Sequence, residues 1–138
     1  MTEEIKKSIN ILMVEDNPAD ALLTKETLSE REKAFYKVST VDTGIKALSY
    51  LRNGRAPKPD LLLLDFSLPR MHGFDFLSEI KTDPELKTIP VCMLSTLVSE
   101  ADIEKAKEKG AECHLIKPLD LEEFESISSR IMGDSSLL

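Results

Sequence analysis

Residues 59–69 read Pro-Asp-Leu-Leu-Leu-Leu-Asp-Phe-Ser-Leu-Pro. Four consecutive leucines between turn residues predict a short strand that is buried on both faces of a parallel sheet. Asp65 follows the leucines directly, at the strand end where ligands bind in open parallel sheets. A carboxylate beside an apolar core is unstable unless a cation or hydrogen bonds satisfy it. An aspartate in this place can also be a simple turn residue, and the other strand ends decide between the two interpretations.

The composition indicates one globular domain without a basic surface. The 138 residues are 41% hydrophobic and 31% charged, which suits a single packed domain. Eighteen Lys and Arg against 25 Asp and Glu give a net charge of −7, which argues against non-specific binding of nucleic acid or an anionic membrane. No apolar run has the length of a signal-peptide core or of a membrane span, so we expect a cytoplasmic protein.

The two cysteines, Cys92 and Cys113, lie inside predicted strands and lack the spacing of metal ligands. Disulfides are rare in cytoplasmic proteins. We therefore expect reduced thiols in the core, with a disulfide or a redox switch as the weaker alternative.

Apolar runs and helix-start signals alternate five times along the chain. This order predicts a three-layer α/β sandwich around a parallel sheet, formed by one domain over residues 1–138 with a core from about 9 to 132 and a frayed tail at 133–138. The predicted strands are residues 9–14, 36–40, 61–64, 89–94 and 113–116, of which 36–40 is the least apolar and is expected near an edge. The helix-start signals are Asn17-Pro18, Asp42-Thr43-Gly44, Gly73, Ser99 with Asp102, and Asp120 with Glu123. The residues predicted to face inward from the helices are Ala19, Leu22 and Leu23; Ala47, Leu48 and Leu51; Phe74, Leu77 and Ile80; Ile103 and Ala106; and Leu121, Phe124, Ile127 and Ile131.

Polar side chains stand at the ends of four of these strands. Glu15-Asp16 follow the first strand, and Asp65 follows the third. Ser95 follows the fourth strand and Lys117 the fifth. In a parallel sheet these ends lie along one edge, so three carboxylates, a hydroxyl and an ammonium group would meet there. The carboxylates repel one another, and Lys117 offsets only one of them. Oxygen ligands suit Mg²⁺ or Mn²⁺, so we expect such an ion at this edge.

A divalent metal beside an aspartate makes chemical sense if the aspartate attacks phosphorus. Carboxylates can act as covalent nucleophiles and form aspartyl phosphates. The metal would neutralise charge on the phosphoryl oxygens while Lys117 and the Ser95 hydroxyl hold the others. Each residue alone also has a structural interpretation, as a turn carboxylate, a strand-end hydroxyl or a surface charge. Their coincidence at the strand ends favours a functional site.

Four motifs follow one another in a set order and spacing. They are Val14-Glu15-Asp16-Asn17, then Leu64-Asp65 with Leu68-Pro69-Arg70-Met71-His72-Gly73 after it, then Ser95 after residues 89–94, and finally Lys117-Pro118. Together they resemble the receiver domain of two-component response regulators, over nearly the whole chain from about Ile9 to Met132. The resemblance implies a flavodoxin-like fold with five helices and a five-stranded sheet in the order 2-1-3-4-5. It also implies a cis peptide between Lys117 and Pro118, an otherwise rare bond.

The resemblance further implies a phosphorelay function. Asp65 would accept a phosphoryl group from a phosphohistidine of a sensor histidine kinase or of a histidine phosphotransfer protein. Mg²⁺ would lie on Asp16, Asp65 and the backbone carbonyl of Ser67, with Glu15 acting through water. The chain would be a signalling phospho-acceptor and not an enzyme, although it would catalyse its own phosphorylation and dephosphorylation. Residues 14–20 are most similar to the stand-alone receivers that are paired with phytochrome-type sensor kinases.

In this family, a hydroxyl residue and an aromatic residue on the fifth strand act together as a switch, and these positions hold Ser95 and His114. A histidine is smaller than the usual Tyr or Phe and can carry a charge near neutral pH. His72 stands where an acidic residue is common, and we expect it to be a solvated surface group. The output surface would be the fourth helix, fifth strand and fifth helix, which would contact a downstream protein because residues 133–138 are too short for an output domain. Formation of a homodimer stays open.

Two other protein classes fit the sequence less well. A phosphohydrolase of the haloacid-dehalogenase kind uses a second aspartate two residues after its nucleophile, and Ser67 occupies that position. A cofactor-binding flavodoxin must hold a phosphate in its first loop, where Glu15-Asp16 would repel it, and the five glycines form no phosphate-binding loop. A phosphotransfer intermediate and a receiver-like module that binds proteins without phosphorylation remain as alternatives.

Overall fold

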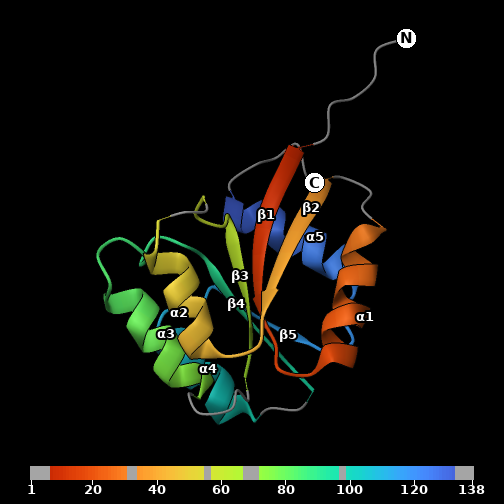
Figure 1. The fold of residues 1–138 in the computed structure, drawn as a ribbon. Coiled ribbons are helices and arrows are strands. Elements are labelled where there is room, and N and C mark those ends of the chain that lie inside the picture. Colours follow the sequence, from red (N-terminus) through yellow and green to blue (C-terminus); the bar gives the residue numbers. More distant parts are fainter. Residues whose placement is uncertain (1–6, 31–33, 55–56, 67–71, 97–98, 133–138) are drawn as a thin grey trace.

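The structure is a computed structural model, and it describes residues 7–30, 34–54, 57–66, 72–96 and 99–132. Strands and helices alternate through the described part of the chain (Figure 1). The elements are β1 (Lys7–Val14), α1 (Pro18–Ser29), β2 (Ala34–Val41), α2 (Gly44–Arg52), β3 (Leu61–Asp65), α3 (Gly73–Thr82), β4 (Val91–Ser95), α4 (Glu100–Glu108), β5 (Cys113–Ile116) and α5 (Leu121–Met132). None of the helices that the structure describes is long and apolar enough to cross a bilayer.

The strands form one parallel sheet in the order β2-β1-β3-β4-β5, which confirms the predicted topology. β2 lies at the edge, as its lower apolar content predicts. β3 lies in the centre, and its four leucines are at most 1% exposed. Because every strand pair is parallel, all the carboxyl ends lie at one edge of the sheet, the lower edge in Figure 1.

Two helical layers cover the two faces of the sheet, with α2, α3 and α4 on one side and α1 and α5 on the other (Figure 1). The leucines of β3 alternate between the two cores that result. Leu62 and Leu64 pack with α2, α3 and α4, whereas Leu61 and Leu63 pack with α1 and α5. The predicted three-layer α/β sandwich is therefore confirmed.

The helix boundaries follow the predicted capping residues. The Asn17 side chain accepts hydrogen bonds from the amides of Ala19 and Asp20 at 2.9 and 3.1 Å, with Pro18 at the first helical position of α1. Asp120 accepts from the amide of Glu123 at 2.9 Å at the start of α5. Further caps are Thr43 for α2 and Ser99 for α4, and Gly110, with φ of +105°, follows the end of α4.

The packing of α1 differs from the prediction. Leu22 and Leu23, which we expected to face inward, are 57% and 55% exposed, and Ala19 is exposed as well. The inward positions of α1 belong instead to Thr24 and Leu28, which lie one helical turn apart. The prediction was wrong because a polar threonine occupies the centre of the buried face, while the two leucines suggested a different face.

The expectation of reduced cysteines was also wrong. Cys92 on β4 and Cys113 on β5 are register partners in neighbouring strands, and they form a disulfide with an S–S distance of 2.07 Å. Register partners in adjacent strands point to the same face of the sheet, so the two side chains meet. The sequence alone does not reveal this register.

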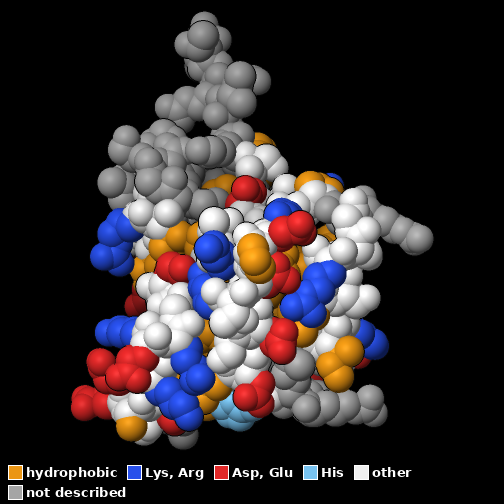
Figure 2. All heavy atoms as spheres, turned by 90° about the vertical axis from the view of Figure 1, so that its left-hand side faces the viewer, with side chains coloured by type: hydrophobic (Ala, Val, Ile, Leu, Met, Phe, Trp, Pro, Cys, Tyr) orange, Lys and Arg blue, Asp and Glu red, His pale blue; other side chains and the backbone are white. Residues whose placement is uncertain are grey.

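The outer face formed by α2 and α3 carries charges of both signs. Figure 2 shows acidic and basic side chains interleaved over the part of this face that is drawn in colour. Arg52 on α2 contacts Glu79 on α3 at 3.3 Å and Asp83, which follows α3, at 3.2 Å. Opposite charges at such distances neutralise one another locally, so the described residues of α2 and α3, taken with Asp83, show no excess of the basic residues that binding to a nucleic-acid backbone requires.

Candidate functional site

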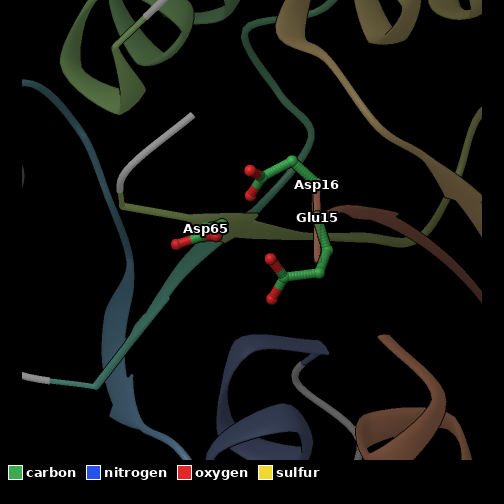
Figure 3. Close-up of side chains that lie close together, drawn as sticks. All are labelled: Glu15, Asp16 and Asp65. Atoms are coloured by element: carbon green, nitrogen blue, oxygen red, sulfur yellow. The ribbon is translucent and has the colours of Figure 1, made fainter. Parts of the chain in front are cut away.

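Three carboxylates meet at the carboxyl edge of the sheet. Glu15 and Asp16 directly follow β1, and Asp65 is the last residue of β3. Each offers an oxygen that lies within 4.8 Å of the oxygens of the other two. Figure 3 shows the three side chains reaching toward a common space from two adjacent strand ends. The structure thus brings together the carboxylates that the sequence predicts at one edge.

The sheet register fixes this arrangement. Val14 on β1 pairs with Leu64 on β3, so the next residues of the two strands, Glu15 and Asp65, lie side by side. Gly73 at the start of α3 lies against the end of β3, where a Cβ atom would come within 2.7 Å of the carbonyl oxygen of Phe66. Only a glycine allows the helix to start this close to the strand that carries Asp65.

Lys117 follows β5 and directs its ammonium group into the same space. Its Nζ atom lies against Oε1 of Glu15, 3.0 Å from Oδ2 of Asp20 and 3.6 Å from Oδ2 of Asp65. Burial by itself lowers the pKa of this lysine, but the hydrogen bonds to Glu15 and Asp20 and the neighbouring negative charges outweigh burial and raise its pKa. Lys117 is therefore a cation held among carboxylates.

Glu15 is buried with 5% of its surface exposed. Burial, followed by a hydrogen bond shared with Asp65, raises the pKa of Glu15 to about 7, although Lys117 acts in the opposite direction. Burial and the nearby Asp65 thus disfavour the ionised form of Glu15, which keeps a proton up to near neutral pH. A second cation would instead favour the ionised form.

Ser95 ends β4, and His114 lies on the neighbouring β5. The hydroxyl of Ser95, which is 4% exposed, lies 2.9 Å from Nε2 of His114. Burial lowers the pKa of His114, so the ring is neutral near pH 7 and the tautomer decides which of the two groups donates. The two predicted switch residues therefore form a hydrogen bond with each other.

These groups line a cavity of about 380 Å³. The residues that line it are Glu15, Asp16, Asn17, Asp20, Asp65, Ser95, Thr96 and Lys117. The donor set fits a hard divalent cation, because it consists of carboxylate oxygens and contains neither sulfur nor imidazole. Moreover, Oε1 of Glu15 is buried and lies against the ammonium group of Lys117, so this oxygen already contacts one cation.

Other predictions for this site have mixed outcomes. The peptide between Lys117 and Pro118 is cis, as the resemblance implies. Ser67, the predicted backbone ligand, lies outside the described residues. His72 is exposed as expected, but its Nδ1 accepts from the amide of Phe74 at 3.1 Å and thereby caps α3. The sequence reasoning missed Asp20, although its place in the first turn of α1, shortly after Glu15 and Asp16, is a signal for the same edge.

Comparison with known proteins identifies the family. A family model for the response regulator receiver domain matches residues 11–128. The chain belongs to this family. As a receiver domain, it acts in two-component phosphorelay signalling, and it is a signalling protein rather than a classical enzyme.

The receiver domain is similar to several regulators from cyanobacteria. It is 35% identical to the response regulator Rcp1 of Synechocystis sp. over 135 residues, which cover 90% of this chain and 86% of Rcp1. The crystal structure of the phosphorylated cyanobacterial phytochrome response regulator RcpA has a TM-score of 0.74 and 38% identity, and covers 91% of this chain and 90% of that one. The structure of the Mn²⁺-bound form of Rcp1 has a TM-score of 0.72 and 32% identity, and the match covers 93% of this chain and 92% of that one.

Proposed function

We propose that Asp65 is the phospho-acceptor of this receiver domain and that its donor is a phosphohistidine. The observation that carries the proposal is the position of the Asp65 carboxylate. It is 8% exposed, lies beside two other carboxylates and has the ammonium group of Lys117 at 3.6 Å. A carboxylate in such surroundings is accessible to a small group in the cavity and has a cation beside it.

Glu15, Asp16 and Asp65 would hold the divalent metal, Mg²⁺ or Mn²⁺. A bound divalent ion supplies positive charge that neutralises the oxygens of a phosphoryl group. The oxygen-only donor set and the raised pKa of Glu15 support this assignment, as does the Mn²⁺-bound form of the similar protein Rcp1. A contribution from the carbonyl of Ser67 stays a prediction.

In the transfer step, one carboxylate oxygen of Asp65 attacks phosphorus and a new O–P bond forms. The N–P bond to the donor imidazole breaks, and its electron pair stays on the departing nitrogen, so no oxidant or further reactant is needed. Lys117 lies where its ammonium can donate to a phosphoryl oxygen on Asp65. Ser95 would donate its hydroxyl to another phosphoryl oxygen after the hydrogen bond to His114 breaks. Dephosphorylation by water would return Asp65 to its carboxylate form.

The exposed leucines of α1 support a protein donor. Leu22 lines a cavity of about 700 Å³ on one side of the site, and Leu23 lines a cavity of about 360 Å³ on the other. Both cavities border the acidic site, the first through Glu15 and Asp16 and the second through Lys117. A docking kinase or phosphotransfer protein would bury these leucines while it brings its phosphohistidine to Asp65. The similarity to phytochrome response regulators supports a phytochrome-type sensor kinase as the donor.

The output surface would be formed by α4, β5 and α5. His114 lies on β5 and contacts at 2.9 Å the hydroxyl of Ser95, which would bond a phosphoryl group in this scheme. Ile116, two residues further along β5, is 59% exposed and offers an apolar contact to a downstream protein. A change at Ser95 can therefore reach a protein-binding surface through one hydrogen bond.

The test is phosphorylation by a small donor. Purified protein with Mg²⁺ and acetyl phosphate should gain the mass of one phosphoryl group, and Asp65→Asn should gain none. Asp42→Asn is the matched control, because Asp42 follows β2 at the same edge but its side chain pairs with Lys46 outside the cavity. Equal labelling of wild type and Asp65→Asn would rule out Asp65 as the acceptor.

A further inference from the structure

Lys117 has three carboxylate neighbours, and they are not equivalent. Two of them, Glu15 and Asp65, belong to the group that would hold the metal. The third, Asp20, is outside that group and accepts a hydrogen bond from Nζ of Lys117 at 3.0 Å. The lysine and a divalent cation would therefore compete for Glu15 and Asp65, whereas Asp20 is not among the three carboxylates that would hold the cation.

The first turn of α1 holds Asp20 in place. Asn17 caps this turn and accepts from the amide of Asp20 itself at 3.1 Å, while Pro18 fixes the first helical position. The positive end of the helix dipole attracts a negatively charged side chain at this position. The Asp20 side chain is 35% exposed and that of Lys117 is 12% exposed, so the pair lies at the rim of the cavity. Asp20 is thus a fixed negative charge between solvent and the site.

We propose that Asp20 is a positioning residue, which holds the ammonium group of Lys117 so that a divalent cation can displace it from Glu15 and Asp65. The inference rests on the proposed function and adds a residue to it. An ammonium group has three N–H donors, and with Asp20 as a permanent acceptor it keeps one strong bond when the cation arrives. The lysine then stays within reach of a phosphoryl group on Asp65.

Without the Asp20 carboxylate, Lys117 would rely on Glu15 and Asp65 as its acceptors among the three contacts described above. A cation would then have to break both contacts and leave the ammonium without a carboxylate partner. We expect Asp20→Asn to weaken the binding of Mg²⁺ about fivefold, because an ammonium group that has lost this acceptor holds Glu15 and Asp65 more tightly, by about the free energy of one partly exposed ion pair. Asp20→Glu keeps the charge and should restore most of the affinity.

The experiment is calorimetric titration of Mg²⁺ into the full chain, which reads metal binding without any phosphorylation. Asp42→Asn is again the matched control, since it removes one negative charge from the same edge without touching Lys117. The same substitution made in a Lys117→Met variant distinguishes an effect of Asp20 through the lysine from a direct effect of its negative charge on the cation. Lys117→Met should bind Mg²⁺ more tightly than wild type, and Asp20→Asn should change the affinity of this variant less than twofold, because the competing ammonium is gone. Thermal unfolding checks that each variant is folded.

The outcomes separate this inference from the proposed function. A fivefold loss in Asp20→Asn that vanishes in the Lys117→Met background supports positioning through the lysine. An equal loss in both backgrounds means that Asp20 acts through bulk charge, and an unchanged affinity means that it does not act on the metal; either result overturns the inference and leaves the phospho-acceptor role of Asp65 intact. If wild type binds no Mg²⁺, the proposed metal site fails as well.

Discussion

Helices α1 and α5 cover the same face of the sheet and have equal lengths of 12 residues, yet they use their apolar residues differently (Figure 1). Helix α5 buries Phe124 completely in the core, and Ile127 and Ile131 pack against the same core. α1 exposes Leu22 and Leu23 and buries Thr24 in their place. Helix α5 is thus anchored by apolar residues, although it also buries Glu125, Ser128 and Ser129, whereas α1 keeps two leucines exposed beside the acidic site that it borders.

The largest loss of stability is expected from a change in the core contact of α5. Phe124→Ala should lower the free energy of unfolding by about 3–5 kcal/mol, because it removes a fully buried ring and leaves a cavity. Urea unfolding followed by circular dichroism measures this loss. Leu23→Ala on α1 is the control and should stay within about 0.5 kcal/mol of wild type, since its side chain is mostly exposed. Equal losses in the two variants would show that Leu23 contributes to the core as much as Phe124 does, which contradicts the exposed position of Leu23.

Glu15, which precedes α1, should make the stability of the metal-free protein depend on pH. Native Glu15 keeps its proton up to about pH 7, whereas in the unfolded chain it releases the proton near 4.5. Native protein binds more protons between these values, so the stability that this residue contributes is complete below 4.5 and is lost as the pH rises toward 7, by at most about 3 kcal/mol.

Unfolding midpoints measured across this pH range with a chelator present test the expectation. Glu15→Gln cannot ionise, so it should lack this part of the pH dependence. If the unfolding midpoint changes equally with pH in wild type and in Glu15→Gln, another residue causes the pH dependence. Mg²⁺ should also reduce the slope, because a bound cation favours the ionised carboxylate.

The exposed leucines of α1 should affect the rate of phosphotransfer and not the stability of the fold. Changing Leu22 and Leu23 together to serine should slow phosphotransfer from a phosphohistidine protein about tenfold, since contact residues of this kind are worth 1–2 kcal/mol. Labelling by acetyl phosphate should be unchanged, because a small donor needs no docking surface. Ile45, 54% exposed at the start of α2, provides a matched control as Ile45→Ser. Slower labelling by both donors would show that the leucines support the site itself.

The sheet and its edge could be predicted from the sequence because they depend on strong local signals. The four leucines of β3 and the polar residues after β1, β4 and β5 are each visible in the chain, and parallel topology brings them together. Helices α2 and α3 bury all the residues predicted for them, and α4 and α5 bury Ala106 and Phe124, whereas Ile103 and Leu121 are only half-buried. These signals need no knowledge of how distant side chains meet.

The errors all concern contacts between distant segments. The buried face of α1 was mispredicted because it contains Thr24, and nothing in the local pattern marks a threonine as a core residue. The disulfide between Cys92 and Cys113 depends on the register of two strands, which the sequence does not show. The bond between Asp20 and Lys117 joins residues 97 positions apart and became visible only in the folded chain.

The most direct measurement locates the phosphoryl group on the chain. Borohydride reduces an aspartyl phosphate to homoserine, so protein treated with acetyl phosphate and Mg²⁺, reduced and digested can be mapped by peptide mass spectrometry. The account predicts homoserine at position 65 and unmodified aspartate at positions 16 and 20. Homoserine at another position, or a phosphorylated protein without any homoserine, would contradict it.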